Sequence, residues 1–301
     1  MKRTITTTTF AMALLGLAAC KGGGADSAKL IPEAATVVGG VDIAGAVKSS
    51  AYTKNKEMIE KGEGKEMLDA ATACNVPLDK WKNITFGADP KTNGFAAVVN
   101  ADGIGNEKNL ECINGKIKEK SGKEPWKVEE KDGKKVLTMG DGNVGYIVNE
   151  GSIVVVSKDW AAGVKDLIDG KGKSVFDGAL KDVIGRADTG KTMWIAGNVP
   201  TEMLKGSPVD GAKDGAASID LSGGLALAAS IGFGSADDAT KKKDELQKQF
   251  DQMKGLAGTF GVPQSVVDSV KIDASGSAVT FSAKASDDDL DKIKAGVMDK
   301  M

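Results

Sequence analysis

The order in which strand-like and helix-like segments follow one another constrains the fold of this chain most. Residues 35–43, which are rich in valine, and residues 192–199 are typical of strands. Each is followed by a short helical pattern, a pair of strands, a longer helix, a further hairpin and another helix, so the order β-α-β-β-α-β-β-α occurs twice. It predicts an α+β fold of two diverged units, with antiparallel sheets and helices packed on one face.

The boundaries of the two units follow from this order. We place the first α+β unit at residues 30–188 and the second at 189–301. Residues 40–43 (GVDI) align with residues 197–200 (GNVP), which indicates an internal duplication. Between the units, apolar residues three and four positions apart over 174–186 predict a helix.

The composition excludes several kinds of active site. The chain has no histidine, so it contains neither a Ser-His-Asp nor a Cys-His catalytic group, nor a His-ligated metal. Arginine, whose planar fork binds phosphates and carboxylates, occurs only at positions 3 and 186. The formal net charge of −2 gives no electrostatic footprint for nucleic acid.

The sequence contains motifs that resemble ligand sites, but the segments next to them are not those that such sites need. The G-x-G-x-x-G of residues 140–145 is followed by a strand-like segment, whereas a dinucleotide site needs a helix there. Asp237 and Asp238, and the three aspartates at 287–289, each open a helical pattern. They are expected to cap those helices rather than to bind phosphate or calcium. The sequence therefore predicts no catalytic residue, no cofactor and no metal.

The first twenty residues have the layout of an export signal. Lys2 and Arg3 precede an apolar run from Phe10 to Ala19, which is too short to span a bilayer. Residues 17–20 (LAAC) resemble the lipobox of bacterial lipoprotein precursors. That resemblance implies removal of a signal peptide at 1–19 and attachment of lipid to Cys20. An ordinary secretory signal that leaves Cys20 free is the alternative.

The resemblance also has implications for location. Lysine at position 21, in place of the aspartate that often marks inner-membrane retention, resembles the outer-membrane class of lipoproteins. We expect an exported protein anchored by lipid, with residues 20–29 as lipidated cysteine and flexible tether. Its expected partners are the membrane, through that lipid, and an envelope protein or a lipid, with no role for nucleic acid.

Two further cysteines remain, Cys74 and Cys112. In an exported protein they meet an oxidising environment, where such pairs usually form a disulfide. We therefore predict a structural disulfide between them. Two buried thiols in a large core are the alternative.

Three functions stay open at this point. We expect a lipid-anchored envelope protein with a non-catalytic binding or structural role, and not an enzyme. A carboxylate-dependent hydrolase such as a glycosidase would instead show two carboxylates about 5–10 Å apart in a deep cleft. A periplasmic carrier of apolar ligands would show a large apolar cavity between sheet and helices.

Overall fold

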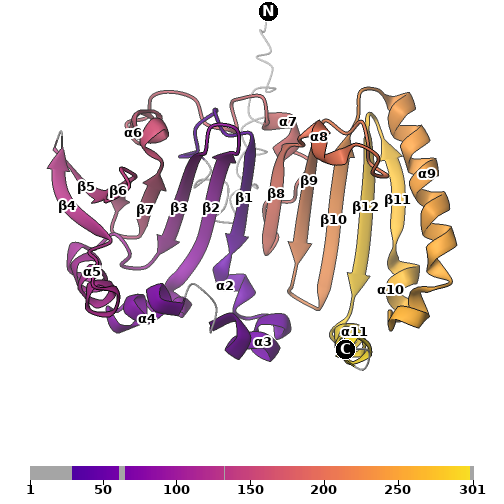
Figure 1. Cartoon of the computed structure of the whole chain (residues 1–301), viewed down its shortest axis with the longest axis horizontal. Helices are drawn as coiled ribbons and strands as arrows, with labels where there is room; N and C mark the ends of the chain where they lie inside the picture. Colours follow the sequence, from indigo (N-terminus) through magenta and orange to yellow (C-terminus); the bar gives the residue numbers. More distant parts are fainter. Residues whose placement is uncertain (1–28, 61–64, 132, 299–301) are drawn as a thin grey trace, which may run out of the picture.

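A computed structural model of the protein describes residues 29–60, 65–131 and 133–298. The predicted signal peptide, Cys20 and the tether up to residue 28 lie outside these residues. Within them, twelve strands form one sheet in the order β11-β12-β10-β9-β8-β1-β2-β3-β7-β6-β5-β4 (Figure 1). All the paired strands are antiparallel. The predicted α+β class is therefore confirmed.

The strands are β1 (Val37–Asp42), β2 (Trp81–Asp89), β3 (Gly94–Ala101), β4 (Trp126–Lys131), β5 (Lys134–Met139), β6 (Val144–Asn149), β7 (Ser152–Val156), β8 (Met193–Asn198), β9 (Asp214–Asp220), β10 (Leu225–Gly232), β11 (Lys271–Ser275) and β12 (Ala278–Ala285). The α-helices are α2 (Ile43–Ala46), α3 (Ser50–Glu60), α4 (Lys65–Ala73), α5 (Glu107–Ser121), α6 (Ala161–Ile168), α7 (Lys181–Ile184), α8 (Thr201–Leu204), α9 (Ala236–Lys254), α10 (Gln264–Ser269) and α11 (Asp287–Met298). Short 3₁₀ turns are η1 (Leu78–Lys80), η2 (Lys158–Trp160) and η3 (Ala257–Phe260).

The two halves of the chain share a strand order. In the first half β1, β2 and β3 form a meander, α5 follows, and the last strand, β7, returns to pair with β3. In the second half β8, β9 and β10 form the meander, α9 follows, and β12 returns to pair with β10. The halves join where β1 pairs with β8, with Gly40 opposite Trp194. The result is one continuous sheet across the 188/189 boundary.

Helical segments cover both faces of this sheet, and not one face as the sequence suggested. Val99 and Ile153 pack with Leu110 of α5, on what we call the α5 face. Their neighbours Val98 and Val154 point the other way and pack with α6, α7 and the segment that joins the halves; this is the α7 face. Central strands such as β3 are apolar at successive positions, so both faces need cover.

The segment between the halves differs from the helix predicted over residues 174–186. Only Lys181–Ile184 is helical. Ser174 instead forms an isolated β-bridge with Pro32, and the amide of Val175 donates to the carbonyl of Ile31 over 2.8 Å. Four apolar side chains of the pattern are nevertheless buried in the core on the α7 face, namely Val175, Leu180, Val183 and Ile184. The pattern therefore predicted burial for most of its apolar positions, but the predicted helix was wrong. Backbone groups at the start of this segment form hydrogen bonds with residues 31–33 instead of with a helix turn.

Candidate apolar ligand site

A pocket of about 700 Å³ lies beside one end of the central strands, lined by residues of α2, α3, α4 and η1. Figure 1 shows these helices along that end of the sheet. Its size falls within the range of about 300–1,000 Å³ that is usual for ligand pockets. The lining residues are Ile43, Ala46, Val47, Ala51, Tyr52, Asn55, Met67, Leu68, Leu78, Trp81, Ile84 and Leu221.

Side-chain caps at the starts of α2 and α3 position these two helices, which form the first wall of the pocket. The side chain of Asp42, the last residue of β1, accepts a hydrogen bond from the amide of Gly45 over 3.0 Å. The chain therefore passes from strand to helix without a loop. The hydroxyl of Ser49 accepts from the amide of Tyr52 over 3.1 Å and starts α3 in the same way. Consecutive short helices thus fold their apolar residues over the end of the sheet.

The polar groups in the lining have partners within the protein. The amide nitrogen of Asn55 donates to the carbonyl of Ala51 over 2.9 Å, and its oxygen accepts from Lys294 over 3.5 Å. The indole nitrogen of Trp81 donates to the carbonyl of Val76 over 3.1 Å. No charged side chain is among the residues that line the pocket. An occupant therefore meets mainly carbon, which favours an apolar ligand.

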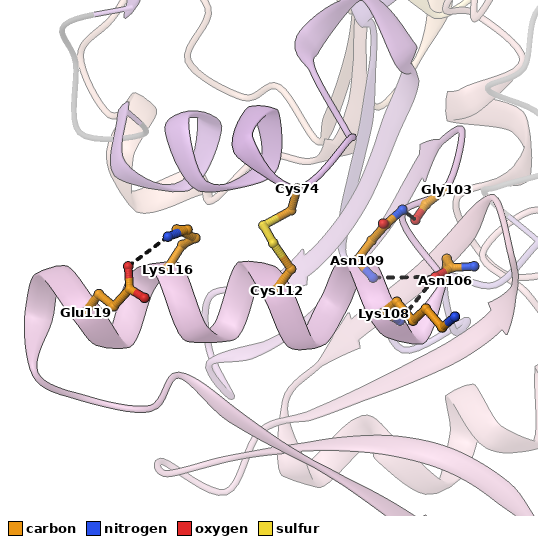
Figure 2. The surroundings of a disulfide bond; sticks show 8 residues. All are labelled: Cys74, Gly103, Asn106, Lys108, Asn109, Cys112, Lys116 and Glu119. Carbon is orange, nitrogen blue, oxygen red and sulfur yellow. Dashed lines mark hydrogen bonds and ion pairs between the residues drawn. A yellow bond between two sulfur atoms is a disulfide. The ribbon is translucent and has the colours of Figure 1, made fainter.

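A disulfide between Cys74 and Cys112 fixes the second wall (Figure 2). Cys74 directly follows α4, which contributes Met67 and Leu68 to the pocket, and Cys112 lies on α5. The Cα atoms are 5.7 Å apart, and the sequence separation is 38 residues. The bridge therefore ties the pocket helix α4 to a helix that is packed on the sheet.

The start of α5 is fixed as well. The side chain of Asn106 accepts from the amides of Lys108 and Asn109 over 3.1 and 3.4 Å. The side chain of Asn109 in turn donates to the carbonyl of Gly103 over 2.9 Å. The wall of the pocket is thus linked to a helix whose N-terminus is capped by a side chain.

The acidic clusters singled out in the sequence lie in the first turns of α9 and α11, which serine side chains cap. At the start of α9, Ser235 accepts from the amide of Asp238 over 3.1 Å. In the first turn of α11, Ser286 accepts from the amide of Asp289 over 3.1 Å, and the carboxylate of Asp289 accepts from the hydroxyl of Ser265 over 2.7 Å, which lowers its pKa. The described residues bring together no group of three or more metal-ligating side chains.

The carboxyl groups with clearly shifted pKa values are held in their ionised form by hydrogen bonds and ion pairs. Each one with a clear pKa shift has its pKa lowered, as in Asp220, where the amide of Ser222 and the ammonium of Lys191 bring it to about 2. A general acid near neutral pH needs a raised pKa instead. Within the same residues, no helix combines the length and apolar character needed to cross a bilayer.

The pocket residues were not identified from the sequence. They are mostly half-buried aliphatic side chains from five separate segments, and each segment alone looks like ordinary core. Only the general expectation of a cavity between sheet and helices, attached to the carrier hypothesis, anticipated such a site. Cys20, the expected lipid attachment point, lies outside the described residues.

Comparison with known proteins gives a likeness of fold. No protein-family model matches the sequence, and no curated protein matches it. Crystal form III of TP0453 is similar over 90% of this chain and 98% of that one, with a TM-score of 0.56 and 10% sequence identity. Crystal form IV is similar over 92% and 97%, with a TM-score of 0.53 and 10% identity. At this identity the likeness shows that the chain shares its overall fold with TP0453.

Proposed function

We propose that this protein is an exported, lipid-anchored component of the bacterial cell envelope that binds an apolar ligand without chemically changing it. The observation that carries the proposal is the pocket beside the sheet, with its volume of about 700 Å³ and its apolar lining. A purely structural module has no need of such a space. The pocket therefore favours a binding role over a structural one.

Two features support the export and anchoring part of the proposal. Residues 17–20 resemble a lipobox, so Cys20 would carry the lipid and residues 20–29 would join it to the folded body. A disulfide such as that between Cys74 and Cys112 is typical of proteins outside the reducing cytosol. Lys21 supports the outer membrane as the destination.

The hydrolase alternative receives less support. Its active site would need a pair of carboxylates facing a cleft. The pocket has no carboxylate in its lining, and the aspartates at 237–238 and 287–289 open helices. We therefore place the function in binding.

Ligand binding can be tested with a fluorescent long-chain fatty acid as the probe. Ala51 lines the pocket from α3, so Ala51→Trp fills part of the space. We expect the wild type to bind the probe and this variant to lose about tenfold or more in affinity. Ala274→Trp, at an exposed position in β11, is the control and should bind normally. Absence of binding by the wild type, or normal binding by a folded Ala51→Trp protein, would contradict the proposal.

The anchor is tested by the intact mass of protein extracted from membranes with detergent. We expect the mass of residues 20–301 plus lipid, and loss of membrane association in Cys20→Ala. Cell fractionation and mass spectrometry provide both readouts. A wild-type protein with an unmodified Cys20 would show that the anchoring part is wrong while leaving the pocket to be judged by its own test.

A further inference from the structure

We infer that the ligand is a lipid with two hydrocarbon chains, one chain held in the pocket and the other lying on the open sheet surface next to it. This inference rests on the proposed binding function and names the class of ligand. It follows from the apolar surface on the α5 face of the sheet, which continues the pocket across the central strands.

That surface, which we call the apolar floor, consists of Val41, Ile84, Met193 and Ile219 in one row, and of Phe86 and Ile195 in the next. Strand pairing defines the rows. Val41 of β1 lies opposite Ile84 of β2 and Met193 of β8, and Met193 lies opposite Ile219 of β9. Because directly paired residues share a face, these side chains project to the same side.

The floor and the pocket are continuous. Ile84 belongs to both, and Leu221 of the pocket lies two residues beyond Ile219 in the chain. The side chains of the floor that lie farthest from the cover of helices are strongly exposed: Met193 is 40% and Ile195 is 45% accessible. Large aliphatic side chains exposed beside an apolar pocket indicate a surface that another apolar group covers.

Helices stand on the α5 face at both sides of the floor. On one side α4 and α5 pack over β3 and the strands beyond it. On the other side α9 packs against β11 and β12, through residues such as Phe250 and Ile272. Figure 1 shows these helices towards the opposite ends of the sheet. The floor is therefore the bottom of a trough.

The helices that form the walls of this trough limit what kind of partner can cover the floor. A helix adds about 10 Å of height to a sheet face, so the same face of a second copy cannot lie flat on the floor. A partner helix would cover the floor but would leave the pocket behind α2, α3 and α4 empty. Two hydrocarbon chains are slender enough for both spaces, and they need no hydrogen-bonding partner in either.

The test compares lipids that differ by one chain. The probes are dioctanoyl phosphatidylcholine and monooctanoyl lysophosphatidylcholine, and calorimetry gives their affinities for the full chain carrying Cys20→Ala, whose own lipid cannot compete. Each buried methylene contributes about a fourfold gain. Because the floor is open on one side, we expect the two-chain lipid to bind about tenfold or more tightly than the one-chain lipid.

A floor variant, Met193→Ser combined with Ile195→Ser, should abolish that gain and leave one-chain binding unchanged. The matched control combines Met253→Ser with Leu256→Ser, which removes two side chains that are 60% and 56% exposed at the end of α9. This control should retain the gain. As a second readout, alkylation of Ile195→Cys should slow with the two-chain lipid and not with the one-chain lipid.

The outcomes separate the two proposals. One-chain binding without a two-chain gain, or a floor variant that loses both lipids equally, overturns the present inference and leaves the binding function standing. A dimer in sedimentation that the floor variant breaks, with no two-chain gain, makes the floor an interface between copies and also overturns it. Failure of both lipids to bind overturns the binding function and this inference together.

Discussion

Lys54 of α3 and Asp291 of α11 form an ion pair across 237 residues of sequence, with 2.5 Å between Nζ and Oδ2. The hydroxyl of Ser50 donates to Asp287 beside it. Since Ala51 and Asn55 of the same helix α3 line the pocket, one wall of the ligand site is tied to a C-terminal helix of the chain. The hydrogen bond that Lys54 donates to Asp291 raises the pKa of Lys54.

Breaking this ion pair should speed the release of ligand. We expect Lys54→Ala and Asp291→Ala each to raise the dissociation rate of a bound fatty-acid probe about two- to fivefold, because the pair is exposed and screened by solvent. The double variant should add little to either single variant. Stopped-flow displacement measures these rates. Lys116→Ala, which breaks an ion pair with Glu119 on α5, is the control, and an equal effect there would refute a specific role for Lys54.

The disulfide predicts a stability effect that is linked to the pocket. Replacing both Cys74 and Cys112 with serine should lower the free energy of unfolding by about 3–4 kcal/mol, since the bridge restricts the unfolded chain. Because α4 lines the pocket, probe affinity should fall as well. Urea denaturation and probe titration measure the two effects. A double variant with unchanged stability would mean that core packing alone holds α4 to α5.

A close approach in the centre of the sheet predicts a second effect on stability. A Cβ atom at Gly40 would lie 2.4 Å from the indole nitrogen of Trp194, closer than real contacts allow. Gly40→Ala should therefore lower the free energy of unfolding by about 1–3 kcal/mol. Gly115→Ala is the matched control. Position 115 lies within α5 with nothing within 4 Å of an added Cβ, so that variant should gain about 0.5–1 kcal/mol.

Urea denaturation of both variants checks these values. Equal stability of Gly40→Ala and wild type would mean that Trp194 moves aside without cost. The pair of variants also tests how the two halves are joined, because Gly40 lies on β1 and Trp194 lies on β8.

The regular elements were predictable from the sequence because their patterns are local. The strand at 35–43 is rich in valine, the helix at 106–120 has apolar residues three and four positions apart, and the structure has both within a few residues. The pairing of β1 with β8 was not predictable in this way. It joins residues that are more than 150 positions apart, and no local pattern specifies such a partner.

The apparent repeat in the sequence also shows that a local pattern does not specify where a residue lies in the sheet. The sequence match sets Gly40 against Gly197, but in the sheet Gly40 pairs with Trp194 and Gly197 pairs with Val37. Residues 37 and 40 are an odd number of positions apart, so the two glycines point to opposite faces. The match therefore reports similar turn and strand chemistry rather than equivalent positions.

The residues of the candidate site could not be predicted from the sequence for a related reason. Apolar side chains at a pocket wall have the same chemistry as those of a core, and only the final packing separates them. Leu68 and Ile84, for instance, belong to segments that read as a plain helix and a plain strand. The disulfide was easier to anticipate because cysteine carries a chemical signal that is independent of the fold.

The carboxyl of Asp220, at the end of β9 just before Leu221 of the pocket, predicts how stability depends on pH. The amide of Ser222 donates to it over 2.9 Å, Lys191 donates to it over 2.9 Å, and its pKa falls from 3.8 to about 2. A lowered carboxyl pKa contributes stability that is present above 3.8 and is lost as pH falls towards 2.

Asp220→Asn should therefore be less stable than wild type by about 1–2 kcal/mol at neutral pH. That difference should shrink as pH falls below 3.8 and be lost as it falls through about 2, the folded-state pKa. Urea denaturation across this pH range, with NMR titration of the carboxyl, measures both quantities, and a difference that did not change with pH would show that Asp220 acts through packing rather than through its charge.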